Sequence, residues 1–155
     1  MSSKKSIKAT KIIISQVALL VGGLIYVTFR SNHLLMFKWF ECLNISPFIV
    51  DIRNNYGGFG IYEWVEYNLP AALWLFSYMY LIDAIWGETK DTKRKMFFVW
   101  ILPLLALMSE FMQLVDILPG TFDVFDLVGY LLAILTYVLI KKGVIWKKLK
   151  SFCRS

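Results

Sequence analysis

Four long apolar runs constrain this chain more than any other feature of its sequence. The first, at 12–29, has eighteen residues without a charge, and a helix rising about 1.5 Å per residue needs about that length to cross a bilayer core. Similar runs follow at 68–86, 96–118 and 124–140. The chain is 58% apolar over 155 residues, which is too apolar for a soluble domain and too short for two domains. We therefore expect an all-α integral membrane protein with one four-helix domain over residues 1–155.

Basic residues occupy alternate connections between these runs. Fourteen of the seventeen Lys and Arg residues are Lys4, Lys5, Lys8 and Lys11 before the first run, Lys90, Lys93, Arg94 and Lys95 between the second and third, and Lys141, Lys142, Lys147, Lys148, Lys150 and Arg154 after the fourth. Basic flanks stay on the cytoplasmic side of a membrane. The pattern predicts that both termini are cytoplasmic, and it argues against nucleic-acid binding, which needs the basic residues on one face.

The long connection at 30–67 is too often interrupted by charges and turn residues to cross the membrane. Its segment 34–43 combines three aromatic residues with Lys38 and Glu41, a mixture typical of a helix lying at headgroup depth. We expect an interfacial segment here, on the outer side and directly after the first span. On the opposite side, Asp83 lies near the inner end of the second span and is expected to reach the cytoplasmic interface beside the basic cluster at 90–95, with a buried functional role as the alternative.

Glu110 is not explained by membrane insertion alone. It lies about eight residues inside the outer end of the third run, or about 12 Å deep at helical rise. A carboxylate at a helix centre costs at least about 2.5 kcal/mol and usually marks a functional site. At 100° per residue one helix face collects a polar stripe consisting of Ser109, Glu110, Gln113 and Asp116.

A second polar stripe runs along the fourth span. It consists of Asp123, Asp126, Tyr130 and Tyr137. The short turn at 118–122 makes the third and fourth spans antiparallel neighbours, so we hypothesise that both stripes face each other and open at the outer side. Carboxylates gathered there would favour protonation of one member, which could then act as a general acid. Asp123 has a simpler reading as a helix N-cap.

Three further residues at mid-membrane in the second span are candidates to line the same polar cleft. They are Trp74, Ser77 and Tyr78. Glu110, Asp123 and Asp126 also offer the oxygen ligands that Ca²⁺ or Mg²⁺ prefers, but beyond one i, i+3 pair they show no metal-binding spacing. We therefore expect no metal and no cofactor.

The two stripes contain a recognisable pattern. Ser-Glu-x-x-Gln runs from Ser109 to Gln113, and Gly-x-Phe-Asp-x-x-Asp runs from Gly120 to Asp126. This pattern resembles the signature of the VanZ-like membrane proteins, and the four-helix layout agrees with that family. The family often has Asn and then Gly four and seven residues after the second Asp, where this chain has Tyr130 and Ala133.

The resemblance implies a multi-pass protein of the bacterial cytoplasmic membrane with a role in the cell envelope, because the family is associated with low-level resistance to the lipoglycopeptide teicoplanin.

Three functions fit the residues. The first is recognition of a lipid-linked or lipopeptide ligand in an outer-facing polar cleft, with membrane lipids as neighbours. The second is an enzyme using Glu110, Asp123 and Asp126 as acid and base on a lipid-linked substrate. The third is a small proton-coupled transporter subunit, which would act as a homo-oligomer.

Overall fold

The computed structural model describes residues 2–31, 35–58, 62–87 and 89–152, and the side chains of those that fall within 7–143. These residues form α1 (Ser2–Phe29), α2 (Leu35–Cys42), α3 (Ser46–Tyr56), α4 (Glu63–Tyr67), α5 (Leu69–Trp86), α6 (Thr92–Leu114) and α7 (Val124–Phe152). Four stretches in the described chain are long and apolar enough to cross a membrane: Ile7–Phe29, Leu69–Trp86, Thr92–Leu114 and Val124–Gly143. The fold is therefore all-α and of the multi-pass membrane type, as the apolar runs predict.

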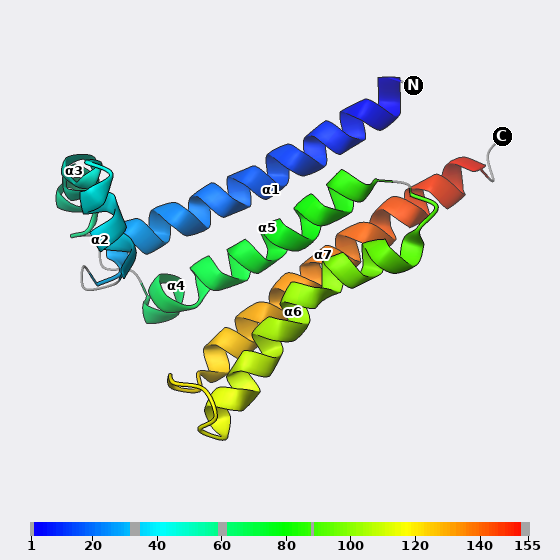
Figure 1. The fold of residues 1–155 in the computed structure, drawn as a ribbon. Helices are drawn as coiled ribbons and strands as arrows, with labels where there is room; N and C mark the ends of the chain where they lie inside the picture. The colour runs from blue at the N-terminus through cyan, green and yellow to red at the C-terminus, as the bar shows by residue number, and fades with distance from the viewer. Residues whose placement is uncertain (1, 32–34, 59–61, 88, 153–155) are drawn as a thin grey trace.

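Helix α5 is the centre of the bundle. Figure 1 shows α1 along one side of it and the α6–α7 hairpin along the other, and the helix contacts agree with this arrangement. The start of α1 and the end of α7 lie at the same end of the bundle (Figure 1). Its central place makes α5 the most buried of the four spans, and its Met79 and Tyr80 form a core cluster with Val99 of α6 and Tyr137 of α7.

The bounds of α6 correct the predicted third span. The helix begins at Thr92 because the Asp91 side chain caps it, accepting a hydrogen bond from the Arg94 N–H at 3.1 Å. It ends at Leu114, where 118 was expected. Asp116 adopts a left-handed conformation with φ of 58°, and the Ile117 N–H turns back to the Met112 carbonyl at 2.9 Å. Asp116 therefore lies outside the helix, and helical spacing does not place it on the same face as Glu110.

Small residues let α1 and α5 approach closely. Ser15 is fully buried, and its carbonyl oxygen accepts a 2.8 Å hydrogen bond from the Ser77 hydroxyl. A Cβ placed on Gly22 would lie 2.8 Å from Nε1 of Trp74, so no larger residue fits there without a shift. Small side chains with an interhelical hydrogen bond are the usual means of packing helices in lipid.

The predicted interfacial helix corresponds to α2, and α3 and α4 gather with it at the end of α1 opposite to the N-terminus (Figure 1). Arg53 of α3 fastens this region to α1, because its guanidinium donates to the carbonyl oxygens of Val27 at 2.7 Å and Arg30 at 2.9 Å. These donations satisfy carbonyls at the end of α1 that have no partner within the helix.

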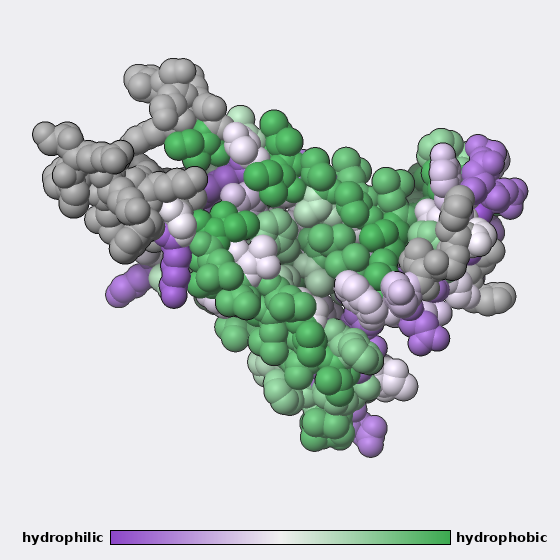
Figure 2. Space-filling view, turned by 180° about the vertical axis from the view of Figure 1, so that it is seen from behind, coloured by the Kyte–Doolittle hydropathy of each residue, from purple (hydrophilic) through white to green (hydrophobic). Residues whose placement is uncertain are grey.

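The surface of the molecule is divided along the helix axes. Figure 2 shows apolar side chains over the middle and the lower tip of the visible face and hydrophilic ones mainly at its left and right margins, and a broad apolar surface is what a lipid-facing bundle requires. We call the end that carries Asp83, Lys95 and Lys141 the lysine end. We call the opposite end, with Asn68 and Glu110, the carboxylate end.

Candidate functional site

Asn68 joins two carboxylates at the carboxylate end. Its Nδ2 donates hydrogen bonds of 2.9 Å to Oδ2 of Asp123 and of 2.9 Å to Oδ1 of Asp126. Asn68 is 5% exposed and occupies the N-cap position of α5, but its side chain makes no cap hydrogen bond. The amide is therefore directed across to α7, where it provides donors to two charged groups.

Glu110 completes a group of three acids. It is 4% exposed, and its Oε2 accepts a long hydrogen bond of 3.4 Å from the Asp123 backbone N–H. Asp123 and Asp126 both act on it electrostatically. Among the described residues no Lys or Arg forms an ion pair with these three acids, although Arg30 acts on Asp126 at longer range. The group is therefore rich in negative charge and poor in positive charge.

Asp123 also has the simpler role that its position suggests. Its Oδ1 accepts a 2.8 Å hydrogen bond from the Phe125 N–H, just where α7 begins at Val124. This is the geometry of an Asp N-cap. Its other carboxylate oxygen accepts from Asn68, so the residue caps the helix and belongs to the acidic group at once.

The remaining members of the two predicted stripes are distributed unequally. Tyr130 lies within electrostatic range of Glu110 and Asp126 and belongs to the group. Gln113 packs instead against the turn, where a Cβ on Gly120 would lie 2.8 Å from Nε2 of Gln113. Two other stripe residues lie apart: Ser109 donates to the Ala106 carbonyl of its own helix, and Asp116 is exposed beyond the end of α6.

The expectation that Trp74, Ser77 and Tyr78 line the same cleft is corrected. Trp74 and Ser77 lie on the side of α5 that packs against α1. The Tyr78 hydroxyl donates to the Phe98 carbonyl at 2.5 Å, twelve residues and about 18 Å along α6 from Glu110 at helical rise. Residues 74 and 77 therefore project toward α1 and residue 78 toward α6, a difference that a position at mid-membrane does not reveal.

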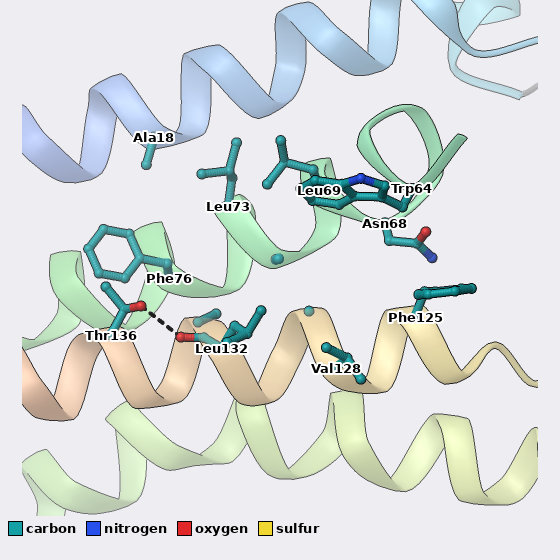
Figure 3. A pocket seen from close by; sticks show the side chains of 13 residues that line it. Ala18, Trp64, Asn68, Leu69, Leu73, Phe76, Phe125, Val128, Leu132 and Thr136 are labelled. Carbon is teal, nitrogen blue, oxygen red and sulfur yellow. Dashed lines mark hydrogen bonds between the residues drawn. The ribbon is translucent and has the colours of Figure 1, made fainter. Parts of the chain in front are cut away.

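An apolar groove leads away from Asn68 into the membrane region. It has a volume of about 610 Å³ and runs between α1, α5 and α7 (Figure 3). Asn68 and Phe125 lie at one end of it, and Phe76 and Thr136 at the other (Figure 3). Gly129 and Ala72 both line the groove and lie close together, since a Cβ on Gly129 would lie 3.3 Å from the Ala72 Cβ.

The lysine end has the opposite charge balance. Asp83 is 3% exposed and is surrounded by lysines from three other helices. Lys11 donates to its Oδ2 at 2.5 Å, and two ammonium groups approach Oδ1, that of Lys95 at 2.7 Å and that of Lys141 at 3.8 Å. The Lys95 approach is an ion pair rather than a well-directed hydrogen bond. Asp83 thus lies beside the 90–95 cluster as expected, but it is buried and joins α5 to α1, α6 and α7.

Asn68 is the residue of the acidic group that the sequence argument missed. The available signal is an amide at the first position of the predicted run 68–86, at the same end of the predicted bundle as Asp123. In the described residues no group of three or more His, Cys, Asp or Glu side chains is arranged to hold a metal ion.

In comparisons with protein-family models, curated proteins and solved structures, nothing matches the chain.

Proposed function

We propose that this chain is a VanZ-like protein of the bacterial cytoplasmic membrane that recognises a lipid-linked or lipopeptide ligand at its carboxylate end. Two sequence motifs support the family, Ser-Glu-x-x-Gln at Ser109 and Gly-x-Phe-Asp-x-x-Asp at Gly120. The positive-inside rule supports an orientation with the lysine end in the cytoplasm and the carboxylate end outside. In this orientation the acidic group and the groove meet at the outer leaflet.

The single observation that carries the proposal is the double position of Asn68. It lines the end of the apolar groove and donates to both Asp123 and Asp126. An amphiphile has the matching form, with an apolar chain beside a polar headgroup. Binding pockets for such molecules are largely apolar, with a few converging polar groups that fix orientation.

The charge of the site indicates which headgroups it favours. Three carboxylates with one neutral amide donor attract a ligand that brings donors of its own, such as ammonium, amide or hydroxyl groups. Glycopeptide and glycolipid headgroups are rich in such donors. A headgroup with exposed phosphate alone is disfavoured by like charge.

Growth of a bacterium with and without the protein, across envelope-active agents that include teicoplanin, tests the proposal. The parent should raise the tolerated concentration of at least one agent, and Glu110→Gln or Asp126→Asn should remove that protection at matched expression. Asp116→Asn is the control, because it removes an exposed acid that lies outside the group. If all three variants protect as well as the parent, the acidic group is not the recognition site.

The same variants separate recognition from the enzyme and transporter alternatives. A recognition protein loses affinity with no turnover to lose. An enzyme that uses Glu110 as an acid would keep binding its substrate in Glu110→Gln while product formation stops. A proton-coupled transporter would instead show flux that depends on pH and that this substitution abolishes.

A further inference from the structure

The lysine end holds more positive charge than its single buried acid balances. The Nζ atoms of Lys11, Lys95 and Lys141 all lie within 3.8 Å of a carboxylate oxygen of Asp83. Three ammonium groups around one carboxylate leave an excess of two positive charges. Like charges this close repel one another, so a second anion beside them lowers the energy of the group.

Lys141 is the member most available to a second anion. Lys11 and Lys95 have side chains only 21% and 14% exposed and make the two short ion pairs with Asp83, whereas that of Lys141 is 44% exposed and lies farthest away. Lys95 is held further by the Gly87 carbonyl at 2.6 Å. The ammonium of Lys141 has only the Tyr137 hydroxyl, at 3.2 Å, as its hydrogen-bond acceptor in the described chain.

The position of this group along the helices matches the depth of lipid phosphates. The membrane-spanning stretches end at Trp86 and Gly143 and begin at Ile7 and Thr92, so the three lysines lie at the boundary of the apolar region. Trp86 stacks on Phe98 there, with 5.6 Å between ring centroids. Aromatic rings with basic residues between helix ends are typical of sites for anionic headgroups.

We propose that Lys11, Lys95 and Lys141, the lysine cluster, bind the phosphate of an anionic phospholipid, with Asp83 holding the ammonium groups in place. Lys141 donates to the phosphate from the lipid-facing side, and the acyl chains lie along the apolar surface of α6 and α7. This site is independent of the ligand proposed for the carboxylate end. It attaches the bundle to the leaflet that faces the lysine end.

The neighbouring residue offers a matched control. Lys141→Gln and Lys142→Gln remove the same charge at the same depth, but Lys142 is exposed and is not part of the ion-pair group around Asp83. The full-length protein, purified in neutral detergent, is titrated with phosphatidylglycerol, with phosphatidylcholine or with inorganic phosphate. Native mass spectrometry counts bound lipid, and the midpoint of thermal unfolding reports stabilisation.

Phosphatidylglycerol should bind the parent and Lys142→Gln alike and raise their unfolding midpoints. A basic residue beside an anionic headgroup contributes about five-fold in affinity, so Lys141→Gln should weaken binding by about that factor or more. Lys141→Arg, which keeps the charge, should retain binding. Because Lys141 is half exposed, its loss should leave the bundle folded.

Three outcomes would overturn the proposal. Equal weakening by Lys141→Gln and Lys142→Gln would indicate diffuse attraction to the basic surface. Equal binding of phosphatidylcholine would show that the acyl chains alone account for it. Equal stabilisation by inorganic phosphate would identify a soluble anion as the ligand.

Discussion

Asp83 and Glu110 are the two most buried carboxylates of the described residues, 3% and 4% exposed, and their surroundings are opposite in charge. Asp83 is met by three lysines from three helices. Glu110 lies near two further acids, Asp123 and Asp126, and accepts a 3.4 Å hydrogen bond from the backbone N–H of Asp123. A buried charge is tolerated when it is paired, and only Asp83 meets that condition.

This difference separates a buried charge that pairing explains from one that pairing leaves unexplained. The burial of Asp83 can be understood from stability, because its ion pairs connect α5 to α1, α6 and α7. The carboxylate end cannot, because gathering Glu110, Asp123 and Asp126 without a paired cation costs free energy in the absence of a ligand. Such unbalanced groups are found where a protein binds or reacts.

The largest expected effect on stability comes from Asp83→Asn. The substitution leaves three ammonium groups close together without an acid, and breaking a buried ion pair by removing one partner costs about 3 kcal/mol or more. Unfolding of the purified protein in detergent measures this loss. Lys11→Gln in the Asp83→Asn background should recover part of the stability, because it relieves repulsion. An Asp83→Asn protein as stable as the parent would remove the structural account of the lysine end.

Asn68→Ala should have the next largest effect. The substitution removes two hydrogen bonds to charged acceptors and leaves the repulsion between the Asp123 and Asp126 carboxylates without a donor between them. It should lower the free energy of unfolding by about 2 kcal/mol. The same unfolding assay compares it with Asn55→Ala, which loses one 3.3 Å hydrogen bond to Asp51 on an exposed surface and should be near neutral. Equal losses of stability in the two variants would show that the hydrogen bonds from Asn68 to Asp123 and Asp126 do not contribute more than an exposed hydrogen bond.

Glu110→Gln should change stability in the opposite direction to Asp83→Asn. Removing one of three like charges should stabilise the folded protein by about 1 kcal/mol, while the proposed recognition is lost. Its unfolding is compared with that of the parent in the same detergent. Marked destabilisation would mean that the Glu110 charge is structural, and the contrast between the two ends would then fail.

Asp116→Asn should have the smallest effect. The residue is exposed and lies beyond α6 with φ of 58°, a conformation that Asn also adopts readily. Its change in stability should stay within about 0.5 kcal/mol. A larger effect in the unfolding assay would indicate that the carboxylate end extends to the α6–α7 turn.

The sequence predicts the spans well because apolar length and basic flanks determine membrane helices almost by themselves. It also predicts that Glu110 lies near Asp123 and Asp126, since the short turn forces α6 and α7 together. It fails where backbone detail decides. The run 96–118 predicts Asp116 on the polar face, because nothing in its sequence marks the end of α6 at Leu114.

The sequence also does not predict which neighbouring helix each side chain of α5 contacts. Ser77 and Tyr78 are adjacent, yet one hydrogen-bonds to α1 and the other to α6. Asn68 is only the first residue of the predicted run 68–86, and a polar residue at a helix end normally faces water. The hydrogen bonds of Asn68 depend on the packing of α5 against α7. The two helices approach closely where Gly129 lies against Ala72.

The central claim is that the groove and the acidic group form one ligand site, and a double-mutant cycle tests it most directly, read out as tolerance of an envelope-active agent against which the parent protects. Val128→Trp fills the groove from an exposed lining position, and Leu131→Trp is its control, because Leu131 is similarly exposed but does not line the groove. We predict that Val128→Trp, Asp126→Asn and their combination lose protection to the same extent, while Leu131→Trp retains it. Protection by Val128→Trp equal to that of the parent, or losses that add independently, would contradict a single site.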